Sequence, residues 1–261
     1  MIHPLLSIQA HMQTWAGNNY RLTLAGKALR KYKNLHENQR CFIVANGPSL
    51  TAEDLDKLSE HGEITFGMNR IYKFFDQTKW RPTYYVCEDE LIAHDQQKEI
   101  NAIHAKAKFI PAELKWYHDV KIDKACYFHI NYNDNIRFPY SFSTEIDKQI
   151  ECRGTVTFTC MQIAAYMGFS EIYLLGVDHN YRVTLDINGN QVVDPEAKDY
   201  FTEDYDTDIK DIVVHDMGNN TRAYIDARKY CEVNKSTKIF NATRGGKLEV
   251  FERVDFDSLF T

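Results

Sequence analysis

The chain has 261 residues with a formal net charge of −6 at pH 7, and 44% of its residues are hydrophobic. This composition supports a packed core and excludes a disordered chain, and the acidic balance argues against a protein that covers nucleic acid. No apolar run approaches the length of about 18 residues that a membrane-spanning helix needs, and the start of the chain lacks a signal-peptide pattern. The six cysteines are scattered without a C-x-x-C pair, so we expect reduced thiols and no zinc site. We therefore expect a protein of the cytoplasm.

Residues 1–40 are expected to form an N-terminal helical extension, because apolar residues recur among polar ones through most of this segment. The extension contains a basic cluster, Lys27, Arg30, Lys31 and Lys33. Two interpretations stay open. The helices pack on the sheet or on another subunit of a homo-oligomer, or they make a peripheral contact with anionic lipid at the inner face of the membrane.

The stretch that follows predicts a strand, a tight turn and a helix. An apolar run starting at residue 41 ends in the turn residues Asn46, Gly47, Pro48 and Ser49, and helical spacing begins after Thr51. Ser49 or Thr51 is suited to cap this helix. Free backbone amides and the positive end of the helix would then converge where the strand stops, which is the usual ligand position in open α/β sheets. A phosphate-bearing ligand would fit there, although an ordinary capped turn has the same pattern.

Several later strands are expected to end in polar side chains at the same edge of a sheet. The second strand, within residues 63–72, ends at Asn69, the third ends at Glu88 and Asp89, and the clearest strand, residues 170–178, ends at Asp178. A buried helix over residues 158–167 is expected to stop at Gly168. Because the carboxyl ends of parallel strands meet at one edge, this edge is the predicted active site. The expected fold class is α/β, with a mostly parallel sheet flanked by helices.

Residues 182–214 lack periodicity, contain an Asn188-Gly189 turn and carry an acidic run, which predicts a lid. Residues 131–152 are expected to form a loop that folds over the edge. Two histidines lie close to these features: His179 directly follows a strand end, and His215 directly follows the predicted lid.

The motifs resemble those of the bacterial family-42 sialyltransferases, which transfer a nonulosonic acid from a CMP-sugar. The residues that carry the resemblance are Asn46–Leu50, Asn69, Arg153-Gly154-Thr155 and Met167–Asp178. Together with residues 241–251, the same pattern resembles a broader group that holds the motility accessory factors and the archaeal 6-hydroxymethylpterin diphosphokinases, found in surface-polysaccharide gene clusters. The resemblance implies a Rossmann-like, GT-A-variant fold. Residues 41–261 would then form one nucleotide-sugar-binding domain with its lid at about 182–214.

The resemblance also implies roles for individual residues. The predicted nucleotide-binding residues are Asn46, Gly47, Pro48, Ser49, Asn69, Glu88, Asp89, Thr155, Thr157, Gly176, Asp178 and Tyr181. Arg153 matches an active-site arginine, and His215 has the spacing of the family's catalytic-base histidine. Two features depart from the family: Glu88 and Asp89 replace a donor-contacting asparagine, and the two lid tyrosines have no clear equivalents. Tyr181 stands one residue after the family position, and Tyr200 or Tyr205 would have to fold into the active site.

Sugar transfer from a nucleotide needs a base for the acceptor hydroxyl and groups that stabilise the charge left on the phosphate. We expect His215 to be the base, with His179 as its rival, and Arg153, the turn amides and lid tyrosines to bear the phosphate. The expected partners are a CMP-sugar and a glycan or glycolipid acceptor, as in lipopolysaccharide biosynthesis, without nucleic acid.

Two other functions stay open at this point. In an ATP-dependent diphosphokinase of the 6-hydroxymethylpterin type, Glu88 and Asp89 would ligate Mg²⁺, whereas in a glycosyltransferase they would hold ribose hydroxyls or cap the next segment. The remaining alternative is a non-catalytic binding subunit. For the glycosyltransferase we expect no metal and no cofactor.

Overall fold

The computed structural model describes residues 12–131, 141–185, 190–202, 205 and 217–261. Eight strands form one central sheet, and every pair of neighbours in it is parallel. In spatial order they are β12 (Glu252–Arg253), β11 (Lys238–Asn241), β8 (Glu171–Leu175), β1 (Arg40–Val44), β2 (Thr65–Met68), β3 (Tyr84–Val86), β4 (Ala107–Pro111) and β5 (Ala125–Phe128). The predicted α/β, Rossmann-like fold with a mostly parallel sheet is confirmed.

The direction of chain progress across the sheet changes between β1 and β8. From β1 the chain adds β2 to β5 on one side, whereas β8, β11 and β12 follow on the other side. β1 and β8 pair along their whole length, from Arg40 opposite Glu171 to Val44 opposite Leu175. Such a switch point leaves a crevice beyond the carboxyl ends of the two strands, because their connections leave in opposite directions.

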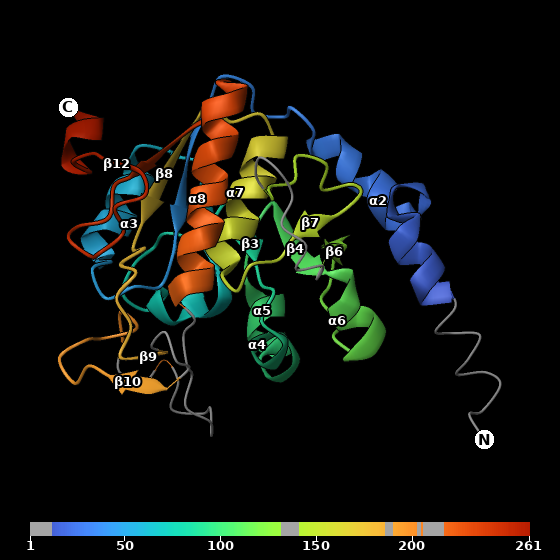
Figure 1. The fold of residues 1–261 in the computed structure, drawn as a ribbon, viewed down its shortest axis with the longest axis horizontal. Helices are drawn as coiled ribbons and strands as arrows, with labels where there is room; N and C mark the ends of the chain where they lie inside the picture. The colour runs from blue at the N-terminus through green and yellow to red at the C-terminus, as the bar shows by residue number, and fades with distance from the viewer. Residues whose placement is uncertain (1–11, 132–140, 186–189, 203–204, 206–216) are drawn as a thin grey trace.

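Helices cover both faces of the sheet, as continuous apolar strands require. The two long helices α7 (Val156–Tyr166) and α8 (Met217–Asn234) lie side by side on one face, and α3 (Ala52–Glu60) lies on the other (Figure 1). Successive side chains of β1 show this alternation, since Ile43 packs in the core under α7 while Phe42 and Val44 pack in the core under α3. Shorter helices follow the strands on the β5 side: α4 (Glu90–Asp95), α5 (Gln97–Ala102) and α6 (Ala112–Tyr117).

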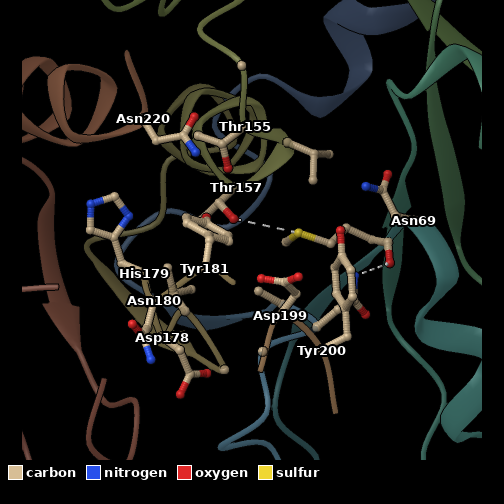
Figure 2. Close-up of a pocket in the computed structure, with 18 of the residues that line it drawn as sticks. Asn69, Thr155, Thr157, Asp178, His179, Asn180, Tyr181, Asp199, Tyr200 and Asn220 are labelled. Carbon is tan, nitrogen blue, oxygen red and sulfur yellow. Dashed lines mark hydrogen bonds between the residues drawn. The ribbon is translucent and has the colours of Figure 1, made fainter. Parts of the chain in front are cut away.

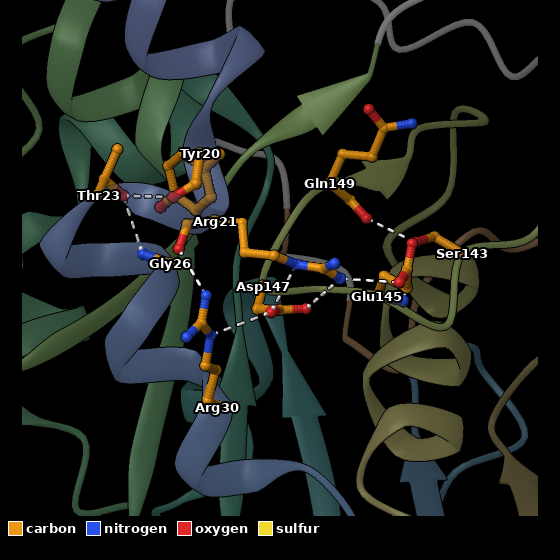
Figure 3. Close-up of polar contacts among 9 residues, drawn as sticks. All are labelled: Tyr20, Arg21, Thr23, Gly26, Arg30, Ser143, Glu145, Asp147 and Gln149. Carbon is orange, nitrogen blue, oxygen red and sulfur yellow. Dashed lines mark hydrogen bonds and ion pairs between the residues drawn. The ribbon is translucent and has the colours of Figure 1, made fainter.

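The N-terminal extension is helical in the described part and packs along the β5 edge (Figure 1). Residues 12–18 are helical, followed by η1 (Tyr20–Leu22), α2 (Leu24–Leu29) and η2 (Arg30–Tyr32). Figure 3 shows how Arg21 and Arg30 converge on the buried Asp147, with N–O distances of 3.0 and 3.4 Å. Arg21 also pairs with Glu145 at 2.8 Å. These ion pairs hold the extension against the segment that leads to α7.

Two short strand pairs occur where the sequence predicts loops. β9 (Val183–Leu185) and β10 (Gln191–Val193) form an antiparallel pair inside the predicted lid, and β6 (Ile130–Asn131) pairs with β7 (Ile150–Glu151). Strands of two or three residues are too short to show an alternating pattern. Two further 3₁₀ helices complete the described elements, η3 (Asn69–Phe74) and η4 (Asp257–Phe260). Within the described ranges, no helix has the length and apolar character needed to cross a membrane.

Candidate active site

A pocket of about 370 Å³ opens beyond the carboxyl ends of β1, β2 and β8, at the switch point of the sheet (Figure 2). Nine of the predicted nucleotide-binding residues line it: Asn46, Gly47, Asn69, Asp89, Thr155, Thr157, Gly176, Asp178 and Tyr181. Four other predicted site residues, Pro48, Ser49, Glu88 and Arg153, are absent from its lining. His215 lies outside the described residues. The structure therefore brings most of the predicted residues together, and their roles toward a ligand stay predictions.

The turn after β1 connects two strand ends rather than presenting its amides to the pocket. The Gly47 amide donates to Gly176 O at 2.9 Å, and both the amide and the hydroxyl of Ser49 donate to Asp178 Oδ2, at 3.3 and 2.8 Å. A Cβ atom added at Gly47 would lie 2.0 Å from Asp178 Oδ2, so this close approach requires glycine. The free amides expected at this turn are thus already engaged within the protein.

The start of α3 is also satisfied internally. Thr51 and Asp54 form a capping box, in which the Thr51 hydroxyl accepts from the Asp54 amide at 3.2 Å. Asp54 in turn binds Arg244 at 2.9 Å. The predicted cap at Thr51 is confirmed, and a negatively charged ligand has little to gain from this helix end.

The N-terminus of α7 faces the pocket instead. Gly154, Thr155, Val156 and Thr157 line the cavity, and the Thr155 side chain makes no capping hydrogen bond. Amides in the first turn of a helix have no acceptor within the helix, and the helix dipole places about half a positive charge there. No lysine or arginine belongs to the described lining of this pocket. The end of α7 therefore contributes positive potential to the pocket, next to the buried Arg153 that precedes Gly154.

Two asparagine side chains leave acceptors unpaired at the opposite wall. Asn46 donates through Nδ2 to Met68 O at 3.2 Å, which orients its amide, and Asn46 Oδ1 has no partner among the described residues. Asn69 Oδ1 is likewise buried without a partner there, and Asn69 has a left-handed φ of +45°. Buried unpaired acceptors are costly, so they favour a ligand that brings hydroxyl or amino donors.

Residues from the predicted lid also line the pocket, and the sequence analysis named only some of them. Tyr200 and Tyr205 both line the pocket and stack on each other, with ring centroids 3.8 Å apart and planes 11° from parallel. The Arg70 guanidinium donates to Tyr205 O, and the Phe201 amide donates to Asn46 O at 3.0 Å. These contacts bring the segment onto the ends of β1 and β2. The expectation was that Tyr200 or Tyr205 would fold into the site, and both line the pocket.

The lining residues that the sequence analysis missed include three with polar side chains, Asp199, Asn220 and Tyr224. Asn220 and Tyr224 stand four residues apart on α8 and are 3% and 1% exposed, so they share its buried face. The Tyr224 side chain lies beside those of Thr155 and Thr157, which brings α8 next to the start of α7. Polar residues at helical spacing on a buried face were the signal that could have identified this pair.

Glu88 and Asp89 have separate environments. Asp89 lines the pocket and caps α4, since its Oδ1 accepts from the Ile92 amide at 2.9 Å. Glu88 accepts from the Thr159 hydroxyl at 2.5 Å, and burial raises the pKa of Glu88 to about 7. The sequence left three roles open for this pair: binding ribose hydroxyls, ligating Mg²⁺ or capping the next segment. The structure shows the capping role for Asp89.

The carboxylates of the pocket are engaged in hydrogen bonds within the protein. Asp89, Asp178 and Asp199 each already accept hydrogen bonds from backbone amides, of Ile92, Ser49 and Arg182 respectively. In the part of the chain that the structure describes, no group of three or more His, Cys, Asp or Glu residues is placed to hold a metal ion.

Comparison with known proteins connects this architecture to one family and one solved fold. Residues 14–184 match the family model described as 6-hydroxymethylpterin diphosphokinase MptE-like. The structure is similar to that of the MAf glycosyltransferase from Magnetospirillum magneticum AMB-1, with a TM-score of 0.52 and 15% sequence identity over 98% of this chain. The chain spans 43% of that protein, and at this identity the likeness shows the fold alone. No curated protein matches the sequence.

The predicted resemblance to the broader group of motility accessory factors and 6-hydroxymethylpterin diphosphokinases is thereby confirmed, whereas the resemblance to the family-42 sialyltransferases stays a prediction. The matched region contains β1 to β8 and the pocket residues up to Tyr181. Since it covers more than half of the sequence, the chain belongs to the MptE-like family.

Proposed function

We propose that the protein is a glycosyltransferase that moves sialic acid or a related nonulosonic acid from a CMP-activated donor to a surface glycan or glycolipid. The observation that carries this proposal is the pocket at the switch point, where the N-terminus of α7 supplies positive potential. One helix end suits the single negative charge of the phosphodiester in a CMP-sugar. The fold shared with the MAf glycosyltransferase supports the same reaction class.

The remaining walls suit the other parts of such a donor. The unpaired oxygens of Asn46 and Asn69 would accept hydrogen bonds from amino or hydroxyl groups of the nucleoside or sugar. The hydroxyls of Tyr181, Tyr200 and Tyr205 would donate to the departing phosphate. Burial raises the pKa of Tyr181, so its hydroxyl keeps the proton that this role requires. Arg153 and His215 stay predicted catalytic residues on the strength of the resemblance.

The diphosphokinase alternative is favoured by the description of the MptE-like family. The triphosphate of ATP carries several negative charges, which phosphate-binding sites balance with lysine, arginine and Mg²⁺. The described lining has no lysine or arginine, and each of its three aspartates accepts a hydrogen bond from a backbone amide. The site residues thus fit a CMP-sugar better than ATP. A non-catalytic binding subunit is the third candidate, and the unpaired buried acceptors fit a bound ligand in that case as well.

We further propose that the N-terminal extension contacts the membrane surface near a glycolipid acceptor, at the cytoplasmic side. Residues 1–36 include five lysines and arginines and no Asp or Glu, in a chain of net charge −6. Leu24, Lys27, Ala28 and Lys31 follow one another at helical spacing, and all four are exposed. Trp15 is also 57% exposed. Basic and apolar side chains in this combination favour an anionic lipid surface. A homo-oligomer through the same surface is the competing interpretation.

A transfer assay tests the proposal directly. The protein would be incubated with CMP-sialic acid and CMP-linked related sugars, each with a panel of glycan and glycolipid acceptors, and CMP release would be measured with EDTA present. We expect acceptor-dependent release from at least one donor. Release of AMP from ATP with Mg²⁺ and a hydroxymethylpterin, without any CMP-sugar turnover, would replace this function with the diphosphokinase.

A further inference from the structure

His179 stands at the end of β8 and lines the pocket (Figure 2). Its side chain is buried, since the residue is 6% exposed, and its backbone has a left-handed φ of +51°. This conformation is uncommon for a residue with a side chain and persists only where neighbouring structure enforces it. Here the Lys247 amide donates to Asp178 O at 2.7 Å. A Cβ atom at Gly246 would lie 2.6 Å from the same oxygen, so the loop after β11 packs tightly against the turn.

The hydrogen bonds around His179 determine which ring nitrogen carries the proton. His179 Nε2 lies 2.8 Å from Thr221 Oγ1, and Thr221 Oγ1 lies 2.7 Å from Met217 O. A carbonyl oxygen only accepts, so the single hydroxyl proton of Thr221 points to Met217 O. The Thr221 oxygen must therefore accept from His179, which places the imidazole proton on Nε2. Nδ1 is left with a free lone pair.

His179 Nδ1 is buried and has no hydrogen-bond partner among the described residues. Burial lowers the pKa of His179, so the ring is neutral near pH 7. The titratable groups that face the ring are Tyr181 and Tyr224, whose ring centroids lie 6.0 and 5.5 Å away, and Asp178 precedes it in the chain. Burial raises the pKa of both tyrosines, so they stay uncharged. A residue that lines the pocket thus carries a neutral imidazole with an unpaired lone pair on Nδ1.

We propose that His179, through Nδ1, is the base that takes the proton of the acceptor hydroxyl. This rests on the proposed glycosyl transfer and assigns its proton acceptor to a residue other than His215. As the acceptor oxygen bonds to the anomeric carbon, its O–H bond breaks and the proton moves to Nδ1. The bond from the anomeric carbon to the phosphate oxygen breaks with its electron pair, so CMP departs. The imidazolium that forms keeps its Nε2–H bond to Thr221, and Nδ1–H returns its proton to solvent after product release.

Thr221 then acts as a positioning residue, because it fixes the ring tautomer without touching the substrate. Thr221→Val keeps the shape of the side chain but removes the hydroxyl, whereas Thr221→Ser keeps the hydroxyl. We expect Thr221→Val to lower kcat with little change in KM, and Thr221→Ser to restore it. Equal losses in both variants would mean a packing role only.

The decisive comparison is between His179→Ala and His215→Ala, with CMP affinity measured by calorimetry and folding by thermal unfolding. We expect His179→Ala to lower kcat about 10²- to 10⁴-fold while CMP affinity stays near that of the wild type. His179→Asn serves as a second variant if the alanine variant does not fold. Near-normal turnover in a folded His179 variant, with loss of turnover in His215→Ala, would overturn the proposal.

NMR spectroscopy tests the protonation state of His179 independently of whether the protein transfers a sugar. The nitrogen NMR shifts of His179 should report a neutral ring protonated at Nε2 at pH 7, with His179→Asn used for assignment. A ring protonated at Nδ1, or a doubly protonated ring, would overturn the inference even if sugar transfer is confirmed. If the wild type turns over no CMP-sugar, the proposed function fails instead, whatever the tautomer.

Discussion

Asp178 accepts two hydrogen bonds from Ser49, one from its amide at 3.3 Å and one from its hydroxyl at 2.8 Å. The two residues stand 129 positions apart and join the end of β8 to the turn after β1. Burial raises the pKa of Asp178, whereas the Ser49 bonds oppose this shift. This contact fixes the mouth of the pocket, because residues from both turns line it.

Gly47→Ala should therefore destabilise the fold and distort the site. The added Cβ would lie 2.0 Å from Asp178 Oδ2 and 2.4 Å from Gly176 O, and backbone cannot move aside without separating the two strand ends. We expect a loss of unfolding free energy of about 1–3 kcal/mol or more, measured by urea unfolding. Ser49→Ala, which keeps the amide bond and loses the hydroxyl bond, should cost about 1 kcal/mol. If Gly47→Ala were as stable as the wild type, the backbone at position 47 could not lie as close to Asp178 and Gly176 as the structure shows.

Glu88 should make stability depend on pH in a defined window. Its pKa is raised from 4.5 to about 7 in the folded state, so the folded state holds the proton over a range where the unfolded chain has released it. The contribution of Glu88 to stability is then highest below pH 4.5, falls as pH rises toward 7, and is constant above that.

Glu88→Gln removes this titration, and the variant should gain stability relative to the wild type as pH rises from 4.5 to 7. The gain should not exceed about 3.5 kcal/mol, since one pKa unit corresponds to about 1.4 kcal/mol. Urea unfolding at several pH values measures it, with the exposed Glu99→Gln as control. A pH-independent difference between Glu88→Gln and the wild type would contradict the raised pKa.

The sequence was most informative where buried elements are long and apolar. β1, β8 and α7 were predicted because parallel strands and helices buried between layers carry continuous apolar runs. Gly168 stops α7 with a φ of +88°, as its position predicted. β10 was missed because its three residues are all exposed, and Val192 and Val193 therefore carry no sign of burial.

Site residues that directly follow a strand could be predicted from the sequence, whereas those placed by tertiary contacts could not. Asn46, Asn69 and Asp178 follow strands, so sheet topology alone places them at one edge. Tyr200 and Tyr205 reach the pocket through tertiary contacts that no local pattern encodes, among them Phe201 against Phe74 with ring centroids 4.1 Å apart. The engaged amides of the β1 turn could not be foreseen either, because their acceptors come from residues after β8.

The pocket tyrosines should affect turnover more than binding. Tyr181→Phe and Tyr200→Phe each remove a hydroxyl that we assign to the departing phosphate, so kcat should fall by about 100-fold if that hydroxyl donates in the transition state. KM for the donor should change little. Tyr72→Phe is the matched control, since Tyr72 lies outside the pocket and its hydroxyl donates to Gln96. Loss of donor affinity with unchanged kcat would instead mark these tyrosines as binding residues.

The N-terminal extension should bind anionic vesicles. Replacing Lys27, Lys31 and Lys33 by Glu should abolish cosedimentation with phosphatidylglycerol vesicles, because each lysine near such a surface contributes about 1 kcal/mol. The matched control replaces three exposed lysines elsewhere, Lys98, Lys229 and Lys235. Binding that survives the first triple variant would remove the membrane proposal. A change of oligomeric state in that variant, without vesicle binding by the wild type, would assign the surface to a second copy.

We propose that the switch-point pocket binds a CMP-sugar without a divalent metal. Calorimetry with CMP and with ATP, each in EDTA and in Mg²⁺, tests it most directly, since it requires no knowledge of the acceptor. We expect CMP binding of equal affinity in both conditions, and weaker binding in Asn46→Ala, which removes the unpaired oxygen. Binding of ATP only in the presence of Mg²⁺, with no binding of CMP, would contradict it.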